Sequence, residues 1–432
     1  MSLYLTSVGC RLNQAEMDDL GQRALAAGLT LVGSAQDCDL AVVNTCSVTA
    51  AAASDSRSAA ARIHRLRPDA SILLTGCWAT LDRARAAQLS GVSTVVPNEA
   101  KDRILAELTD RSRPGPAEPE VATPERRTRP VIKVLDGCNH HCTYCAAAIA
   151  RGPARSLPLR SVVERVQRAE AEGALEVILT GVQLGAYGRE LPGPLSLAGL
   201  LETLLRETRI QRLRLSSLEP WSVNDRLLEL WRDRRMCPQL HLPVQSGCAE
   251  TLRRMGRPIT PSAFEKTAAL ARQAIPGLAL TTDVMVGFPG ETHSDFEASM
   301  AFIERHSFAR MHVFTFSPRP GTPAARLPHR VPSSIARQRA DLARRIAEHS
   351  EREFAAAQIG ELRRVLWETP RLAADHGWRL SGLTEAGLRV VASYPASLHN
   401  TFSLVRLSSL EQNGTIRGQV LASPPCLAPD GT

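Results

Sequence analysis

Residues 137–156 read GCNHHCTYCAAAIARGPARS, and the interpretation of the whole chain starts from this stretch. Cys138, Cys142 and Cys145 stand in a C-x3-C-x2-C pattern. Three soft thiolates on one short loop are one fewer than a closed four-cysteine iron–sulfur site needs. The spacing therefore predicts a metal site with one position left open for a small molecule.

Zinc is the competing interpretation of the same residues. Zinc sites also place cysteines two to four residues apart, and His140 or His141 could supply a fourth ligand. Spacing alone thus leaves a structural Cys3His zinc knuckle open.

The loop resembles the cluster motif of the radical S-adenosylmethionine (SAM) family, C-x3-C-x-aromatic-C, with Tyr144 in the aromatic place. The segment RGPARS at 151–156 is similar to the R-G-x-x-R-S that follows this motif in the methylthiotransferases of that family. The resemblance implies that Cys138, Cys142 and Cys145 hold a 4Fe-4S cluster whose open iron binds SAM, which is cleaved to a 5′-deoxyadenosyl radical. In such an enzyme the cofactor performs the difficult chemistry, and the protein positions it and excludes water.

Length and composition bound the class of protein. At 432 residues the chain has room for about three domains. We expect a cytoplasmic protein that does not span a membrane, because the sequence shows neither an export signal nor a run of 18 apolar residues. The net charge is +8 and only three of the 52 basic residues are lysine. Arginine forks suit phosphate and favour a polyanionic partner, although a GC-rich genome produces the same composition.

Residues 1–111 alternate buried-strand patterns with helical patterns, which predicts a doubly wound parallel α/β domain. Cys10, Cys46 and Cys77 each follow directly on a strand, and the carboxyl ends of parallel strands share one edge of the sheet. Three thiolates are therefore expected at one site, although any single one could be an ordinary buried cysteine. We expect the strands at 3–8, 40–44, 71–75 and 93–96, and helices beginning near 14, 54, 80 and 99.

The sequences GCRLNQAE, NTCSVTA and TGCWA around these cysteines resemble the N-terminal domain of the methylthiotransferases. The resemblance implies that Cys10, Cys46 and Cys77 hold a second 4Fe-4S cluster, again with an open iron. The stretch that follows is rich in proline and charge, which predicts a linker at 112–129.

Residues 130–358 contain six strand patterns separated by helical patterns. Six such units predict a partial TIM barrel, (β/α)6, with its chemistry at the carboxyl ends of the strands. The strands are expected at 131–135, 176–179, 212–215, 239–242, 279–286 and 311–316, with helices beginning near 161, 197, 223, 261 and 292. The arginine-rich segment 333–357 is expected to form a solvated helix of mixed charge that leaves the barrel.

Polar and glycine residues end every one of these strands. The resemblance to the radical SAM family implies that Asp283 lies near the SAM site, at the open end of the barrel. It also implies that the following residues help to hold SAM: Tyr144, Thr180, Gly181, Ser217, Glu219, Gln245 and Gly287. From the residues alone, the serine could cap a helix, and Glu219 and Asp283 could form surface ion pairs.

Residues 359–432 change to short alternating strands at 362–368, 378–383, 388–392 and 403–407, with a last strand ending near 420. This pattern predicts a small all-β barrel, a fold that often binds single-stranded RNA. Position and length resemble the TRAM domain that closes the methylthiotransferases. Ala386 and Gly387 stand where relatives commonly show Asn-Tyr, so we expect the aromatic platform for a base to be missing.

The sequences LTGVQLGAYG, RLRLSSLEP and PVQSGCAETLRRM resemble most closely the branch acting on N6-threonylcarbamoyladenosine (t6A) in tRNA. The resemblance implies that sulfur on the N-terminal cluster accepts a methyl group from one SAM. A radical from a second SAM then removes hydrogen from C2 of t6A at position 37, beside the anticodon, and methylthio sulfur joins that carbon. This carbon is neither acidic nor bonded to a leaving group, so acid–base or nucleophilic catalysis alone would not functionalise it.

The implied partners are the tRNA anticodon loop and an electron donor such as flavodoxin or ferredoxin; the sequence does not identify the sulfur donor. Arg151 and Arg155 are candidates for contacts to phosphate or to the SAM carboxylate, or for structural salt bridges. Two alternatives stay open. One keeps the chemistry but modifies isopentenyladenosine of tRNA or an aspartate of a ribosomal protein. The other is a non-catalytic, zinc-containing RNA-binding protein.

Overall fold

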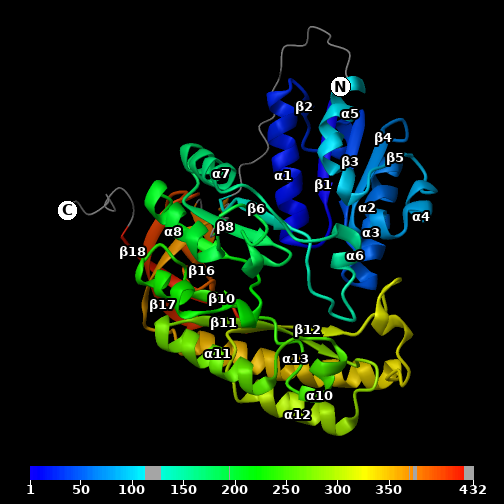
Figure 1. Ribbon diagram of the computed structural model, residues 1–432. Helices are drawn as coiled ribbons and strands as arrows, with labels where there is room; N and C mark the ends of the chain where they lie inside the picture. The colour runs from blue at the N-terminus through cyan, green and yellow to red at the C-terminus, as the bar shows by residue number, and fades with distance from the viewer. Residues whose placement is uncertain (112–127, 194, 369, 373–376, 423–432) are drawn as a thin grey trace.

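The computed structural model describes residues 1–111, 128–193, 195–368, 370–372 and 377–422. Figure 1 shows an N-terminal α/β unit in blue and cyan, a central unit from green to yellow, and a β unit in orange and red behind it. Within the described ranges, no helix is both long enough and apolar enough to cross a membrane. Nearly all of the linker predicted at 112–129 lies outside the described residues.

The N-terminal unit is the predicted doubly wound parallel sheet, with strand order β2-β1-β3-β4-β5. One apolar core lies between the sheet and α2, and a second lies between its other face and helices α1 and α5. The sequence pattern missed β2, because two residues carry no periodicity. The elements are β1 (Ser2–Ser7), α1 (Arg11–Ala26), β2 (Thr30–Leu31), β3 (Leu40–Thr45), α2 (Ala50–Leu66), β4 (Ser71–Gly76), α3 (Cys77–Leu81), α4 (Arg83–Ala87), β5 (Val92–Val95) and α5 (Ile104–Arg111).

The central unit has the six predicted parallel strands, β6, β8, β9, β10, β11 and β12. Single bridges, such as Ser217 to His241, connect the β9 half of this open barrel to the β10 half. The elements are β6 (Val131–Asp136), α6 (Ala147–Arg151), β7 (Arg155–Ser156), α7 (Leu159–Ala171), β8 (Glu176–Gly181), α8 (Leu197–Glu207), β9 (Arg212–Leu215), α9 (Asp225–Glu229), β10 (Gln239–His241), α10 (Ala249–Arg254), α11 (Pro261–Ala274), β11 (Ala279–Val286), α12 (His293–Glu304), β12 (Arg310–Thr315) and α13 (Ser333–Ala356).

The long helix α13 differs from its prediction as a fully solvated helix. Ala340, Ala343 and Ala347 belong to the barrel core, and the Arg339 guanidinium donates to Glu291 at 2.6 Å. The small alanines at helical spacing let α13 lie close against β12 and α12 (Figure 1). The apolar face is narrow and the rest of the helix is charged, so the sequence pattern did not reveal it.

The C-terminal unit is a small closed β-barrel, as the resemblance to TRAM predicted. Five strands close in the order β13-β17-β18-β16-β15 through a β13–β15 pairing, and β14 extends β15. The elements are β13 (Leu362–Trp367), β14 (Arg371–Leu372), β15 (Trp378–Thr384), β16 (Arg389–Tyr394), β17 (Phe402–Leu410) and β18 (Ile416–Ala422).

This module docks at the end of the central barrel where its strands begin. Arg212 in β9 donates to the Leu383 carbonyl at 3.1 Å and pairs with Glu385 at 3.3 Å. Ala386 is buried against Ala279 and Ala309 at the starts of β11 and β12. A small residue at position 386 is therefore required by the contact between the two barrels, and this loop is not an exposed platform for a base.

Candidate functional site

The first cysteine trio lies at the carboxyl edge of the N-terminal sheet. Cys10 follows β1 and precedes α1, Cys46 follows β3, and Cys77 is the first residue of α3 after β4. These three strands are adjacent and parallel, and the strand order reverses at β1 and β3. A crevice at such a reversal is where open α/β sheets bind ligands.

Two glycines allow the strand exits to approach so closely. Gly9 has φ +91°, and a Cβ at this position would lie 2.4 Å from Cys46 Sγ. Gly76 has φ +97°, and a Cβ there would lie 2.3 Å from the Thr45 carbonyl. Only glycine fits both the left-handed backbone and the available space. The conformation brings the turn before Cys10 against Cys46.

The second trio lies on the loop between β6 and α6, over the carboxyl ends of the barrel strands. Backbone N–H groups already point at two of its sulfurs: His140 N lies 3.4 Å from Cys138 Sγ, and Ala147 N lies 3.4 Å from Cys145 Sγ. Burial raises the pKa of the Cys138 thiol to about 11. Amide donors of this kind stabilise the sulfur charge that cluster-bound thiolates carry.

Loops after the barrel strands fix the conformation of this cluster loop. Asn139 N donates to Gln183 Oε1 at 2.9 Å, after β8. Thr143 N donates to the Met255 carbonyl at 2.9 Å, and the Thr143 carbonyl accepts from Ala324 N at 2.8 Å. The cluster loop is therefore attached to the exits of β8, β10 and β12.

The donor geometry fits an iron–sulfur cluster better than a zinc ion. The indole N–H of Trp221 donates to His140 Nε2 at 3.1 Å, which occupies that nitrogen of the first candidate zinc ligand. A zinc ion with Zn–S bonds of about 2.3 Å needs its thiols within about 4.6 Å of one another. Among the described residues, neither set of three thiols is gathered within 4.8 Å as the ligands of a single ion would be.

The two trios approach each other across the domain boundary. Helices α3 and α6 are in contact, so Cys77 lies close to the loop that carries Cys145. Asn98 Nδ2 donates to the Ala150 carbonyl at 2.8 Å and lies 3.8 Å from Cys77 Sγ.

Arg151, the last residue of α6, connects both sites most directly. Its Nε lies 3.3 Å from Cys77 Sγ and its Nη2 donates to Asn13 Oδ1 at 2.6 Å. Its Nη1 lies 2.8 Å from both Glu16 Oε1 and Asp136 Oδ1. The sequence left open whether Arg151 contacts phosphate, contacts the SAM carboxylate or forms a structural salt bridge. In the structure, Arg151 forms a buried salt bridge.

Glu16 on α1 is the centre of this network. Its carboxylate also pairs with Lys133 at 3.1 Å and with Lys101, so two of the three lysines converge here. Burial alone would raise the pKa of Glu16, but Lys101, Arg151 and Lys133 together hold it well below the usual range. The N-terminal sheet and the barrel therefore share one buried ionic contact beside the cysteines.

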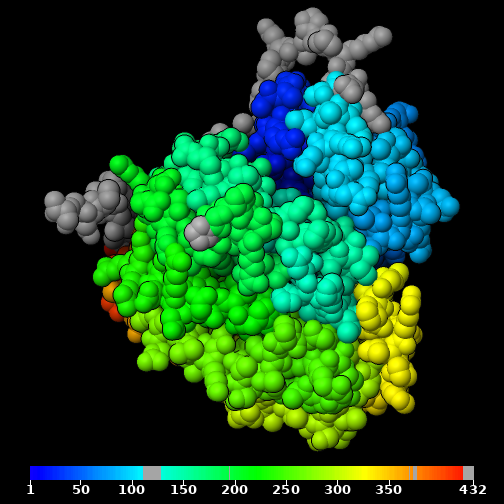
Figure 2. All heavy atoms as spheres, in the orientation of Figure 1, coloured from blue at the N-terminus to red at the C-terminus, as the bar shows by residue number. Residues whose placement is uncertain are grey.

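Arg319, which the sequence did not single out, lies close enough to Cys46 to interact with it electrostatically. It belongs to the segment after β12, which Figure 2 shows in yellow beneath the blue N-terminal unit. In the same segment, Gly321 approaches Ile149 of α6. The sequence SPRPGTP at 317–323 is one of the polar and glycine strand ends that the sequence predicted, but its approach to the other domain was not predicted.

Of the residues predicted to hold SAM, two lie next to the cluster loop or within it, and the others lie at or after the ends of the barrel strands. Glu219 lies close enough to Cys138 to interact with it, and its Oε2 accepts from Gly185 N at 3.1 Å. Burial raises the pKa of Glu219. Tyr144 packs edge-on against Phe288 at 6.4 Å. Both residues lie at the cluster-loop end of the barrel.

Thr180 and Gly181 end β8, and Ser217 is exposed just after β9. Gln245 is buried with φ +72°, and its backbone bonds to β11 on both sides. A non-glycine residue held in this strained region is typical of ligand sites. Gly287 has different surroundings, because its N–H donates to Glu291 at 2.7 Å and a Cβ there would lie 2.8 Å from Ala336 of α13.

Comparison with known proteins agrees with this architecture. A family model described as "Radical SAM superfamily" matches residues 132–303, and one described as "Uncharacterized protein family UPF0004" matches residues 2–97. The structure of the radical SAM methyltransferase TsrM from Kitasatospora setae is similar with a TM-score of 0.58 at 16% identity, covering 75% of each chain. The fold and the cluster loop thus define a radical SAM protein.

Full-length relatives specify the family. The chain is 35% identical to threonylcarbamoyladenosine tRNA methylthiotransferase MtaB of Thermotoga maritima, over 96% of each chain. It is 32% identical to the Bacillus subtilis protein of the same name, over 89% of each chain. The chain belongs to the family of radical SAM methylthiotransferases.

Proposed function

We propose that this protein transfers a methylthio group to C2 of t6A at position 37 of tRNA, by radical SAM chemistry. The observation that carries the proposal is the 35% identity to the Thermotoga maritima enzyme over 96% of both chains. The structural support is the pair of cysteine trios that approach each other at α3 and α6, since the reaction needs both a radical source and a sulfur site near one substrate carbon.

The cofactors are two 4Fe-4S clusters and SAM. We assign one cluster to Cys10, Cys46 and Cys77 and the other to a second set of three: Cys138, Cys142 and Cys145. SAM bound at the barrel cluster supplies a carbon radical that can remove hydrogen from an unactivated C–H bond.

The chain's own residues arrange these groups. Glu219 lies beside Cys138, and Tyr144 is part of the cluster loop and packs against the barrel residue Phe288. Arg151 supplies positive charge beside Cys77. We retain the domain limits 1–111, 130–358 and 359–432. We propose the anticodon loop as the part of tRNA that enters, a flavodoxin or ferredoxin as electron donor, and the cytoplasm, where tRNA is modified, as the compartment.

Mass spectrometry of tRNA nucleosides tests the proposal. The gene is expressed in a host whose tRNA contains t6A without its methylthio derivative, beside Cys46→Ala, Cys142→Ala and an empty vector. We expect methylthio-t6A with the wild-type gene only. Methylthio-isopentenyladenosine in its place would move the protein to another branch of the family, and unchanged tRNA would contradict the function.

A further inference from the structure

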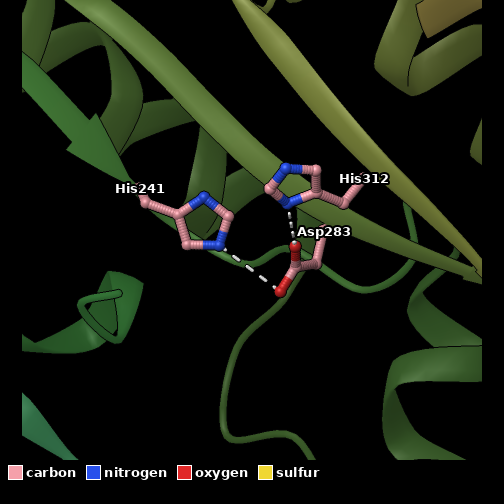
Figure 3. A group of neighbouring side chains, drawn as sticks. All are labelled: His241, Asp283 and His312. Atoms are coloured by element: carbon pink, nitrogen blue, oxygen red, sulfur yellow. Dashed lines mark hydrogen bonds and ion pairs between the residues drawn. The ribbon is translucent and has the colours of Figure 1, made fainter. Parts of the chain in front are cut away.

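A third group of side chains that could bind a metal ion lies in the barrel, on the strands β10, β11 and β12. Figure 3 shows His241 of β10, Asp283 of β11 and His312 of β12 pointing toward one another. His241 Nε2 lies 3.3 Å from Asp283 Oδ2, and His312 Nδ1 lies 3.2 Å from Asp283 Oδ1. One ligand atom from each residue lies within 4.8 Å of the other two.

The three residues occupy adjacent strands of a rigid sheet. On β11, Thr282 and Val284 are buried, and Asp283 between them is partly exposed and faces the barrel interior. His241 is bridged to Ser217 at the exit of β9. The group is thus preorganised by β-sheet pairing and has one side open, because the His312 side chain is 48% exposed.

Thr281 holds the imidazole of His241 in place. Thr281 Oγ1 donates to the Leu240 carbonyl at 3.3 Å and lies 2.9 Å from His241 Nδ1. When Nδ1–H donates to Thr281 in the neutral imidazole, Nε2 carries the lone pair that a metal ion would take, on the side of the Asp283 carboxylate.

We propose that His241, Asp283 and His312 bind one zinc ion at a third metal site, which shares no ligand with either cysteine trio. Two imidazoles and a carboxylate suit zinc and leave a coordination position free for a further ligand from the barrel interior. Thr281 orients His241 as the outer hydrogen-bond partner that metal-bound histidines require.

The test uses anaerobically prepared protein that already contains its iron–sulfur clusters, so that the cysteines are occupied. Zinc is added in small excess, unbound zinc is removed by gel filtration, and metals are counted by mass spectrometry. We expect about one zinc per wild-type chain, bound through N and O atoms at about 2.0–2.1 Å by zinc X-ray absorption. We expect no retained zinc in His312→Ala, and an affinity lowered about 10- to 100-fold in Thr281→Val.

His349→Ala is the matched control, because His349 forms an exposed pair with Glu353 on α13. This control retains zinc as the wild type does, and unchanged iron content shows that each variant is folded. Equal zinc in wild type and His312→Ala, zinc–sulfur distances near 2.3 Å, or no zinc in the wild type would each overturn the proposal. None of these results depends on tRNA modification, so the metal site and the proposed function fail separately.

Discussion

Replacing Arg151 by glutamine should loosen the contact between the N-terminal sheet and the barrel. The Arg151 side chain is 2% exposed, and its ion-pair partners Glu16 and Asp136 are 5% and 13% exposed. Breaking one partner out of a buried ion pair costs about 3–5 kcal/mol. Lys133 remains within 3.1 Å of Glu16 and 3.4 Å of Asp136, so we expect the lower end, about 3 kcal/mol.

Hydrogen exchange measures this loss locally, where global unfolding of a multidomain chain would not. A change of about 3 kcal/mol corresponds to about 100-fold faster exchange. We expect this faster exchange in peptides from α1 and α6 whose amides become exposed when the two domains separate. The amide donors of the C-terminal barrel should be unaffected.

Arg165→Gln is the matched control. Arg165 on α7 pairs with Asp19 on α1 at 2.8 Å, across the same boundary, but the two side chains are 31% and 27% exposed. A solvated pair of this kind contributes at most about 1 kcal/mol. If both variants exchanged alike, the buried network would not hold the domains together as we infer.

Three further predictions follow from other contacts. Glu176→Gln removes the buried carboxylate that Arg214 contacts at 2.7 Å and should destabilise the central barrel by about 3 kcal/mol, measured as faster hydrogen exchange in β8 and β9. Despite burial, Arg214 and Arg212 lower the pKa of Glu176 below 4.5, so its stabilisation is complete above that pH and is lost below it. A glutamine variant as acid-sensitive as the wild type would contradict this. Gly9→Ala places a Cβ 2.4 Å from Cys46 Sγ and should halve the iron content; full iron would refute the packing argument. Affinity for tRNA should fall steeply with salt, because the net charge is +8, and a flat dependence would remove that argument.

Local sequence patterns were sufficient for the longer strands and for the cysteine positions, but not for the two-residue strands β2, β7 and β14. The run LAVVNT of β3 is buried at every residue, as a central parallel strand requires, and Cys46 directly follows it. Parallel strands share their carboxyl edge, so the convergence of Cys10, Cys46 and Cys77 could be inferred before any coordinates.

Contacts between domains could not be inferred in this way. Arg151 and Glu16 are 135 residues apart, and nothing local in either segment selects the other. His241 and His312 could not be recognised as possible metal ligands from the sequence, because only the strand register places them beside Asp283. The narrow alanine face of α13 was hidden because charged residues occur along the whole length of that helix.

Iron and acid-labile sulfide analysis of anaerobically purified protein tests the central claim most directly, namely that two cysteine trios each hold a cluster. We predict about eight iron and eight sulfide per wild-type chain, and about four of each in both Cys46→Ala and Cys142→Ala. Zinc in place of iron in the thiol sites, or an iron content that neither substitution lowers, would contradict it.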